Sequence, residues 1–98
     1  MSVTLINLFT VPPGGEDAFL ARFQEMAARC EGLPGFVRTE LHRNLGAADP
    51  TYAFVNVAVW ESIEAWREGL PKILAGVSLG SGVIPKPGLY EPVLTASA

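Results

Sequence analysis

The segment from Tyr52 to Trp60 carries apolar side chains on both of the faces that a strand would present. Side chains alternate between the two faces of a strand. One face would hold Ala53, Val55, Val57 and Val59, and the other Tyr52, Phe54, Asn56, Ala58 and Trp60. Strands that are buried on both faces read as nearly continuous apolar runs of this kind. The segment therefore predicts a strand inside a sheet that is covered on both sides.

Two further strands and two helices are indicated before the last quarter of the chain. Val3–Thr10 and Phe36–Arg43 are rich in residues that favour strands. Apolar residues at helical spacing predict a helix from Glu16 to Cys30; they are Phe19, Phe23, Met26, Ala27 and Cys30. Ser62 can cap a second helix with Ile63, Trp66 and Leu70 on its inner side.

The end of the chain is punctuated by proline and glycine. The residue before a proline avoids helical angles, so we expect the second helix to end or kink at Leu70-Pro71. We expect 75–88 to be irregular and Leu89–Thr95 to form a short last strand, with Pro92 at an unpaired edge. The resulting order, β-α-β-β-α-β, predicts an α+β fold of ferredoxin-like topology with an antiparallel sheet, as one domain over residues 1–98.

This fold leaves one face of the sheet without cover. A four-stranded sheet is about 19 Å wide, and two helices of about 10 Å each cover that width once. The chain is 49% hydrophobic and only 17% charged, which fits a protein with further apolar surface to hide. A second copy of the same sheet is the simplest cover. We therefore expect a homodimer, and a chain that is merely β-rich with half-exposed valines is the alternative.

Composition and motifs exclude several classes of function. The net charge of −3 and the absence of a basic cluster argue against nucleic acid. No apolar stretch is long enough to cross a membrane, no signal peptide is evident, and the single cysteine fits a cytoplasmic location. Neither metal-ligand spacing nor a phosphate-binding loop is present, and His42 is the only histidine. We therefore expect no metal and no bound cofactor.

Two asparagines interrupt the apolar strands. Asparagine is disfavoured in strands, and a buried amide without partners costs about 1–3 kcal/mol. Asn7 shares a strand face with Phe9, and Asn56 shares one with Tyr52 and Trp60. If that face meets the helices, Phe19, Phe23 and Trp66 could line the same space, which would then be an aromatic pocket with polar groups. Alternatively, each amide could simply satisfy a bulge or a neighbouring carbonyl.

The chain resembles the antibiotic biosynthesis monooxygenase (ABM) domain family, within the dimeric α+β barrel superfamily. The resemblance lies in Phe54-Val55-Asn56-Val57-Ala58-Val59-Trp60-Glu61-Ser62, in Leu5-Ile6-Asn7, in Leu33-Pro34-Gly35-Phe36-Val37 and in Leu89-Tyr90-Glu91. It implies a dimer and a cofactor-independent monooxygenase acting on a small aromatic or quinone-type molecule. It also implies catalytic roles for Asn56, Trp60 and Asn7. Pocket residues expected to bind substrate are Phe9, Phe23, Tyr52 and Trp66.

Two other functions are compatible with the resemblance. Family members that degrade haem use a strand-one asparagine, which Asn7 matches, a tryptophan of the second helix and a histidine further along. Trp66 lies about one turn too early, and residues 72–82 contain no histidine, so we expect no haem degradation. No general base is evident, and a non-catalytic small-molecule-binding or structural dimer is therefore the alternative function.

Overall fold

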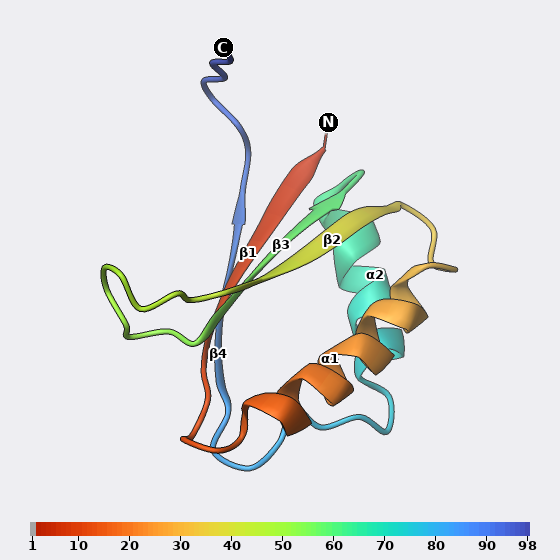
Figure 1. The fold of residues 1–98 in the computed structure, drawn as a ribbon. Coiled ribbons are helices and arrows are strands. Elements are labelled where there is room, and N and C mark those ends of the chain that lie inside the picture. The colour runs from red at the N-terminus through yellow and green to blue at the C-terminus, as the bar shows by residue number, and fades with distance from the viewer. Residues whose placement is uncertain (1) are drawn as a thin grey trace.

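Two helices lie against one face of a four-stranded antiparallel sheet in the computed structural model, which describes residues 2–98 (Figure 1). The elements in chain order are β1 (Val3–Thr10), α1 (Glu16–Cys30), β2 (Phe36–Arg43), β3 (Phe54–Trp60), α2 (Ile63–Leu74) and β4 (Ile84–Tyr90). The strands are arranged in the order β2-β3-β1-β4, and each neighbouring pair is antiparallel. The predicted ferredoxin-like α+β order is thus confirmed.

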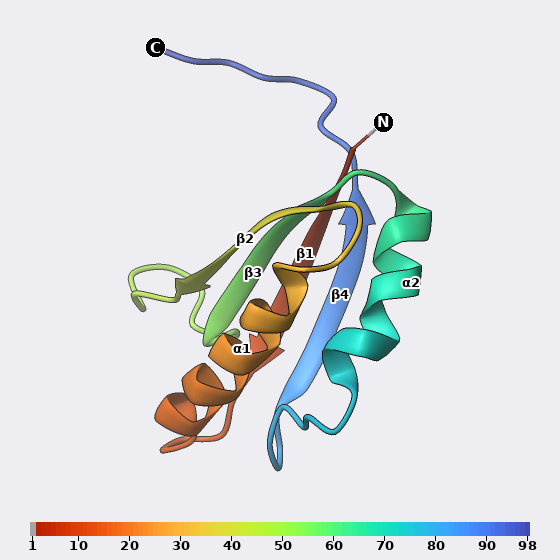
Figure 2. The same ribbon diagram turned by 90° about the vertical axis from the view of Figure 1, so that its right-hand side faces the viewer.

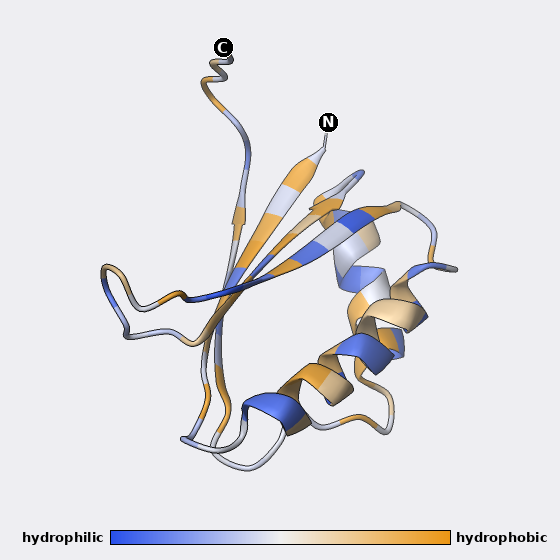
Figure 3. Ribbon diagram, viewed as in Figure 1, coloured by the Kyte–Doolittle hydropathy of each residue, from blue (hydrophilic) through white to orange (hydrophobic). Residues whose placement is uncertain are grey.

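The core fills the space between the sheet and the helices. Along β3 the side chains alternate between buried and half-buried, and the buried set faces the helices. Phe19 of α1 packs on Phe9 of β1 and Phe54 of β3, with ring centroids 4.9 and 5.0 Å apart. β1 and β3 are rich in hydrophobic residues (Figure 3), and those that alternate with the buried set point away from the helices. We call this second side the helix-free face; its apolar, half-buried residues are Ile6, Leu8, Val55, Val57 and Val59.

The last strand lies earlier than the sequence indicated. β4 is Ile84–Tyr90 rather than Leu89–Thr95, and residues 91–98 run away from the body in an extended tail (Figures 1 and 2). Pro85 and Pro87, taken from the sequence as breakers, pair with Phe9 and Asn7 of β1. A strand at the edge of a sheet tolerates proline where the missing N–H would point away from its neighbour. The expectation of an irregular segment is therefore correct only as far as residue 83.

Pro71 does not end α2, which continues to Leu74. Ser62 begins the helix as expected, because its hydroxyl accepts from the Ala65 N–H at 3.1 Å. Tertiary contacts stabilise the last turn: Ile73 is buried in the core, and the Arg29 guanidinium donates to the carbonyl of Ile73 at 3.2 Å. These contacts outweigh the backbone hydrogen bond that a proline cannot make.

β2 contains a bulge that the sequence did not reveal. Phe36 pairs with Trp60, but Arg38 pairs with Val59, so Val37 is an extra residue in β2. Val37 is 52% exposed, and the extra residue changes which side chains of β2 face the helices. Phe36 and Thr39 both face the helices as a result, since both line the cavity described below.

Candidate active site

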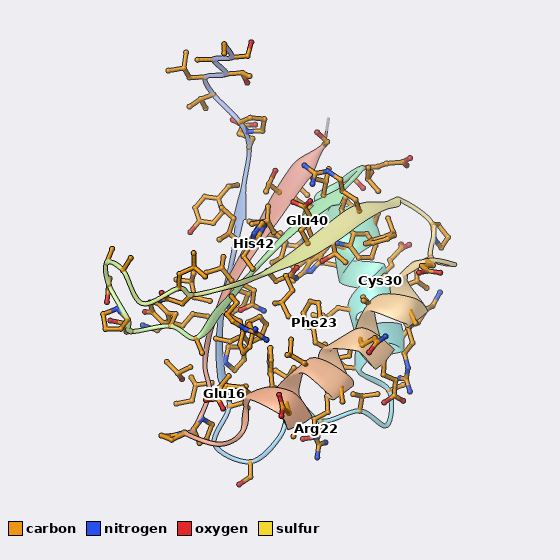
Figure 4. The ribbon with its side chains drawn as sticks, viewed as in Figure 1. Glu16, Arg22, Phe23, Cys30, Glu40 and His42 are labelled. Carbon is orange, nitrogen blue, oxygen red and sulfur yellow. The ribbon has the colours of Figure 1, made fainter. Side chains whose placement is uncertain are left out.

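A partly open cavity of about 240 Å³ lies between the sheet and the two helices. Its walls are mostly aliphatic and aromatic, and its polar side chains are Asn7, Asn56 and Thr39, with the thiol of Cys30 on the α1 side. Phe23 and Cys30 project from α1 into the space between α1 and the sheet (Figure 4). An apolar hollow with a few convergent polar groups is the usual form of a small-molecule site.

Every predicted site residue except Tyr52 lines this cavity. They are Asn7, Phe9, Phe23, Asn56, Trp60 and Trp66. Tyr52 precedes β3, and its ring lies against Lys86, whose ammonium is 5.8 Å from the ring centroid and 3.4 Å from the phenol oxygen. Tyr52 thus lies outside this cavity, because the regular alternation of β3 begins only at Phe54.

The two asparagines are direct neighbours across the sheet. Asn7 of β1 is paired with Asn56 of β3, so both side chains leave the same face of the sheet. The Asn56 side chain is 7% exposed, and its Oδ1 accepts a hydrogen bond from the Thr39 hydroxyl at 2.5 Å. Within residues 2–98 this is the hydrogen bond that the Asn56 side chain makes, which leaves its NH₂ group without a protein partner.

The side chain of Asn7 makes even fewer hydrogen bonds than that of Asn56. Its Oδ1 is buried and has no hydrogen-bond partner among residues 2–98. The residue also lines the cavity, so this amide is an unsatisfied polar group at an apolar hollow. The cavity is therefore lined by two opposed amides whose hydrogen-bonding groups are incompletely satisfied by the protein. Neither amide is satisfied by a neighbouring backbone carbonyl, which was the alternative open from the sequence.

Thr39 and Cys30 are cavity residues whose role the sequence did not indicate. Cys30 is buried and lines the cavity from α1. Burial raises the pKa of the Cys30 thiol, so this group stays protonated at neutral pH. No carboxylate and no histidine lies among the described residues that line the cavity. His42 lies on β2 beside Glu40, 3.5 Å from its carboxylate (Figure 4).

Trp60 forms one wall of the cavity and is held by close packing. It is 1% exposed, and the Phe36 ring lies edge-on to it at a centroid distance of 5.3 Å. The indole also lies directly on the backbone of α2 at Gly69, where a Cβ atom would come within 2.9 Å of Trp60 Cη2. A side chain at residue 69 would therefore displace the indole.

Gly69→Ala should destabilise the protein although alanine favours helices. The gain in helix propensity is about 1 kcal/mol, whereas overpacking a filled site costs about 1–3 kcal/mol. We expect a net loss of up to about 2 kcal/mol by urea denaturation and a shift in tryptophan emission. Gly32→Ala, where a Cβ would meet nothing within 4 Å, is the control and should change the stability by less than about 0.5 kcal/mol. An unchanged stability and emission for Gly69→Ala would contradict this packing.

The family model described as "Antibiotic biosynthesis monooxygenase" matches residues 2–68. The chain belongs to this family. Deoxynogalonate monooxygenase of Streptomyces nogalater is 41% identical over 68 residues, which are 69% of this chain and 54% of that protein. The chain thus spans about half the length of this curated relative.

Solved structures of the ABM family agree with the fold. SnoaB, a cofactor-independent oxygenase from Streptomyces nogalater, is 31% identical with a TM-score of 0.73, covering 96% of this chain and 95% of that one. MhuD, a heme-degrader from Mycobacterium tuberculosis solved with two hemes in its active site, is 28% identical with a TM-score of 0.74, covering 97% and 99%. The chain is therefore similar both to an oxygenase that needs no cofactor and to a protein that degrades haem.

The cavity residues fit haem poorly. The only histidine of the chain, His42, is exposed on β2 and does not line the cavity. Cys30 and Met26 do line it, but burial of the thiol opposes the thiolate form that would bind iron. No group of three metal-binding side chains occurs within residues 2–98. No helix in the same range is long and apolar enough to cross a membrane.

Proposed function

We propose that this protein is a cofactor-independent monooxygenase that oxidises a small aromatic or quinone-type molecule, such as an anthrone. The observation that carries the proposal is the opposed pair of amides, Asn7 and Asn56, which line an aromatic-walled cavity and whose NH₂ groups have no hydrogen-bond partner among residues 2–98. Donors fixed in an apolar site stabilise an oxygen on which negative charge develops. An enolate oxygen is such a group, and the flat cavity walls suit an aromatic ring.

The reaction conserves atoms and electrons without a bound redox group. Loss of a proton to water from the activated CH₂ group gives an enolate, whose oxygen the two amides bind. The enolate transfers an electron to dioxygen, and the two radicals combine into a carbon-bound peroxide anion, which takes a proton back from water to become the hydroperoxide. Loss of water then converts the former CH₂ group into a carbonyl. One oxygen atom enters the product, the other leaves as water, and the substrate supplies the electrons.

Trp60 and Trp66 would enclose the ring system during this sequence. Trp60 is rigidly packed and would direct the hydroperoxide, while Trp66 would bind the ring from α2. The cavity offers no carboxylate or histidine among its described residues, so we assign the first proton transfer to water. The substrate must then have an activated CH group, such as the CH₂ between the two aromatic rings of an anthrone, which loses a proton to give an aromatic enolate.

Oxygen uptake with anthrone tests this proposal. The protein should consume dioxygen in step with formation of anthraquinone, well above the spontaneous rate, and without added metal, flavin or haem. Anthracene, which has the same ring system but no carbonyl, is the control and should not react. The rate should rise with pH along the ionisation of the substrate, because no cavity carboxylate or histidine titrates. Absence of uptake with anthrone and with a hydroquinone panel would favour the alternative function, a non-catalytic binding protein.

A haem titration tests haem degradation, the remaining candidate function. We expect no shift of the Soret band on adding haem, because the cavity lacks the histidine ligand. A cytoplasmic location and a single domain over residues 1–98 stay predictions from the sequence.

We also propose that the helix-free face packs against the same face of a second copy. Its apolar residues remain half-exposed in the single chain, which is a typical property of a surface that a partner covers. Its β2 edge carries charges of both signs, with Arg38 3.4 Å from Glu40, so two copies related by a two-fold axis would not repel each other.

Val57→Lys should dissociate this dimer. Val57 lies at the middle of the helix-free face, between Ile6 of β1 and Glu40 of β2. A lysine there reaches water in the single chain but would lose that hydration in the dimer, a cost that one neighbouring carboxylate, Glu40, does not fully offset; the dissociation constant should rise at least about 100-fold. Light scattering should show a dimer for the wild type and a monomer for the variant. Leu45→Lys, at a position 90% exposed in the β2–β3 loop, is the control; equal masses for Val57→Lys and the wild type would contradict the proposal.

A further inference from the structure

We propose that Thr39 is a positioning residue that sets which end of the Asn56 carboxamide faces the cavity. The Thr39 hydroxyl donates to Asn56 Oδ1 at 2.5 Å, so the oxygen end of the amide is occupied by the protein. The NH₂ end is left to point into the hollow. This inference deepens the proposed function, since it concerns the polarity of the same site.

A bulge in the backbone of β2 turns the Thr39 side chain toward the cavity. Phe36 and Thr39 are separated by an odd number of positions, so a regular strand would send their side chains to opposite faces. The extra residue Val37 changes the alternation, and both side chains reach the cavity. Bulges next to functional sites commonly redirect a side chain in this way.

The polarity of the site follows from this hydrogen bond. With the Asn56 oxygen engaged by Thr39 and the Asn7 oxygen sealed in the protein, the cavity offers donors from both amides. A ligand carbonyl or enolate oxygen satisfies such donors, whereas a ligand hydroxyl that must donate does not. A hydroxyl can also accept, and without Thr39 the amide of Asn56 is free to rotate and present its oxygen instead.

Ligands that differ in one polar group can show, without turnover, whether the cavity offers hydrogen-bond donors or acceptors. Tetralone, tetralol and tetralin share one carbon skeleton and carry a carbonyl, a hydroxyl and no polar group, respectively. Their binding can be followed by calorimetry, and for tetralone also by quenching of the emission of Trp60 and Trp66. These are the only tryptophans in the chain, and both line the cavity. We expect the wild type to bind tetralone about tenfold more tightly than tetralin, as one good hydrogen bond to a buried donor pair would give.

Thr39→Val removes the hydroxyl at constant shape and should reduce this tetralone preference to about twofold or less, with tetralin affinity unchanged. Thr39→Ser, which keeps the hydroxyl, should restore the preference. Thr39→Ala serves in the same way as Thr39→Val if the valine variant does not fold.

Three results would overturn the inference. They are a wild type that prefers tetralol, a Thr39→Val variant that keeps the full tetralone preference, and a variant that loses tetralin and tetralone affinity equally. A protein that shows the expected preferences but no oxygen uptake would refute the proposed reaction and leave the role of Thr39 intact.

Discussion

Asn56→Ala should lower the turnover of anthrone by about 100- to 1,000-fold, the range measured when one donor to a developing oxyanion is removed from an enzyme. The loss should appear in kcat more than in KM, because the negative charge on the oxygen develops mainly after binding. The side chain is 7% exposed, and alanine leaves a small space beside Thr39 rather than an unpaired buried charge. Steady-state oxygen uptake and anthraquinone formation measure both constants.

One control and one further variant complete this experiment. Gln24→Ala removes an amide of similar chemistry from the exposed side of α1 and should keep full activity. Asn7→Ala should also reduce kcat, and the double variant should lose less than the product of the two single effects, because both amides bind one oxygen. An Asn56→Ala enzyme with undiminished turnover would refute the proposed mechanism.

Much of the fold can be predicted from local sequence patterns, and the structure agrees with them. The helical stripe of Phe19 and Phe23 faces the sheet, and the Ser62 cap begins α2, because these signals act within a few residues. The pairing of Asn7 with Asn56 could be anticipated only as a shared face, since the register depends on strands that are distant in sequence. Both asparagines were nevertheless found by a simple argument: amides are out of place in apolar strands.

The structure differs from the sequence-based predictions where tertiary contacts outweigh the local preferences of the residues. Pro85 and Pro87 lie in a strand because that strand is an edge, and edge position is not a local property. Pro71 stays in α2 because Arg29 of α1 binds the carbonyls that follow it. The bulge at Val37 changes which side chains reach the cavity, so the contribution of Thr39 could not be read from alternation alone. The spacing of two between Pro85 and Pro87 was the one available sign of a strand there.

Phe19→Ala should have the largest effect on stability that we predict, a loss of about 3–5 kcal/mol. Phe19 is 1% exposed, and its ring contacts Phe9, Phe23 and Phe54 at centroid distances of 4.9, 6.0 and 5.0 Å. It lies outside the cavity, so every side of the ring meets protein and its removal leaves a void. A domain of this size is stable by only about 5–15 kcal/mol, and the variant should therefore be close to unfolding at elevated temperature.

Phe23→Ala is the informative comparison, because Phe23 lies one helical turn further along α1 and lines the cavity. One side of its ring faces space rather than packed atoms, so fewer contacts are lost, and we expect a cost about 1–2 kcal/mol below that of Phe19→Ala. Urea denaturation at one fixed protein concentration measures both, since a dimer would make the apparent stability depend on concentration. Equal costs for the two variants would mean that the space beside Phe23 is filled by side chains in solution. A filled space could not hold a substrate, and the assignment of this hollow as an active site would then be wrong.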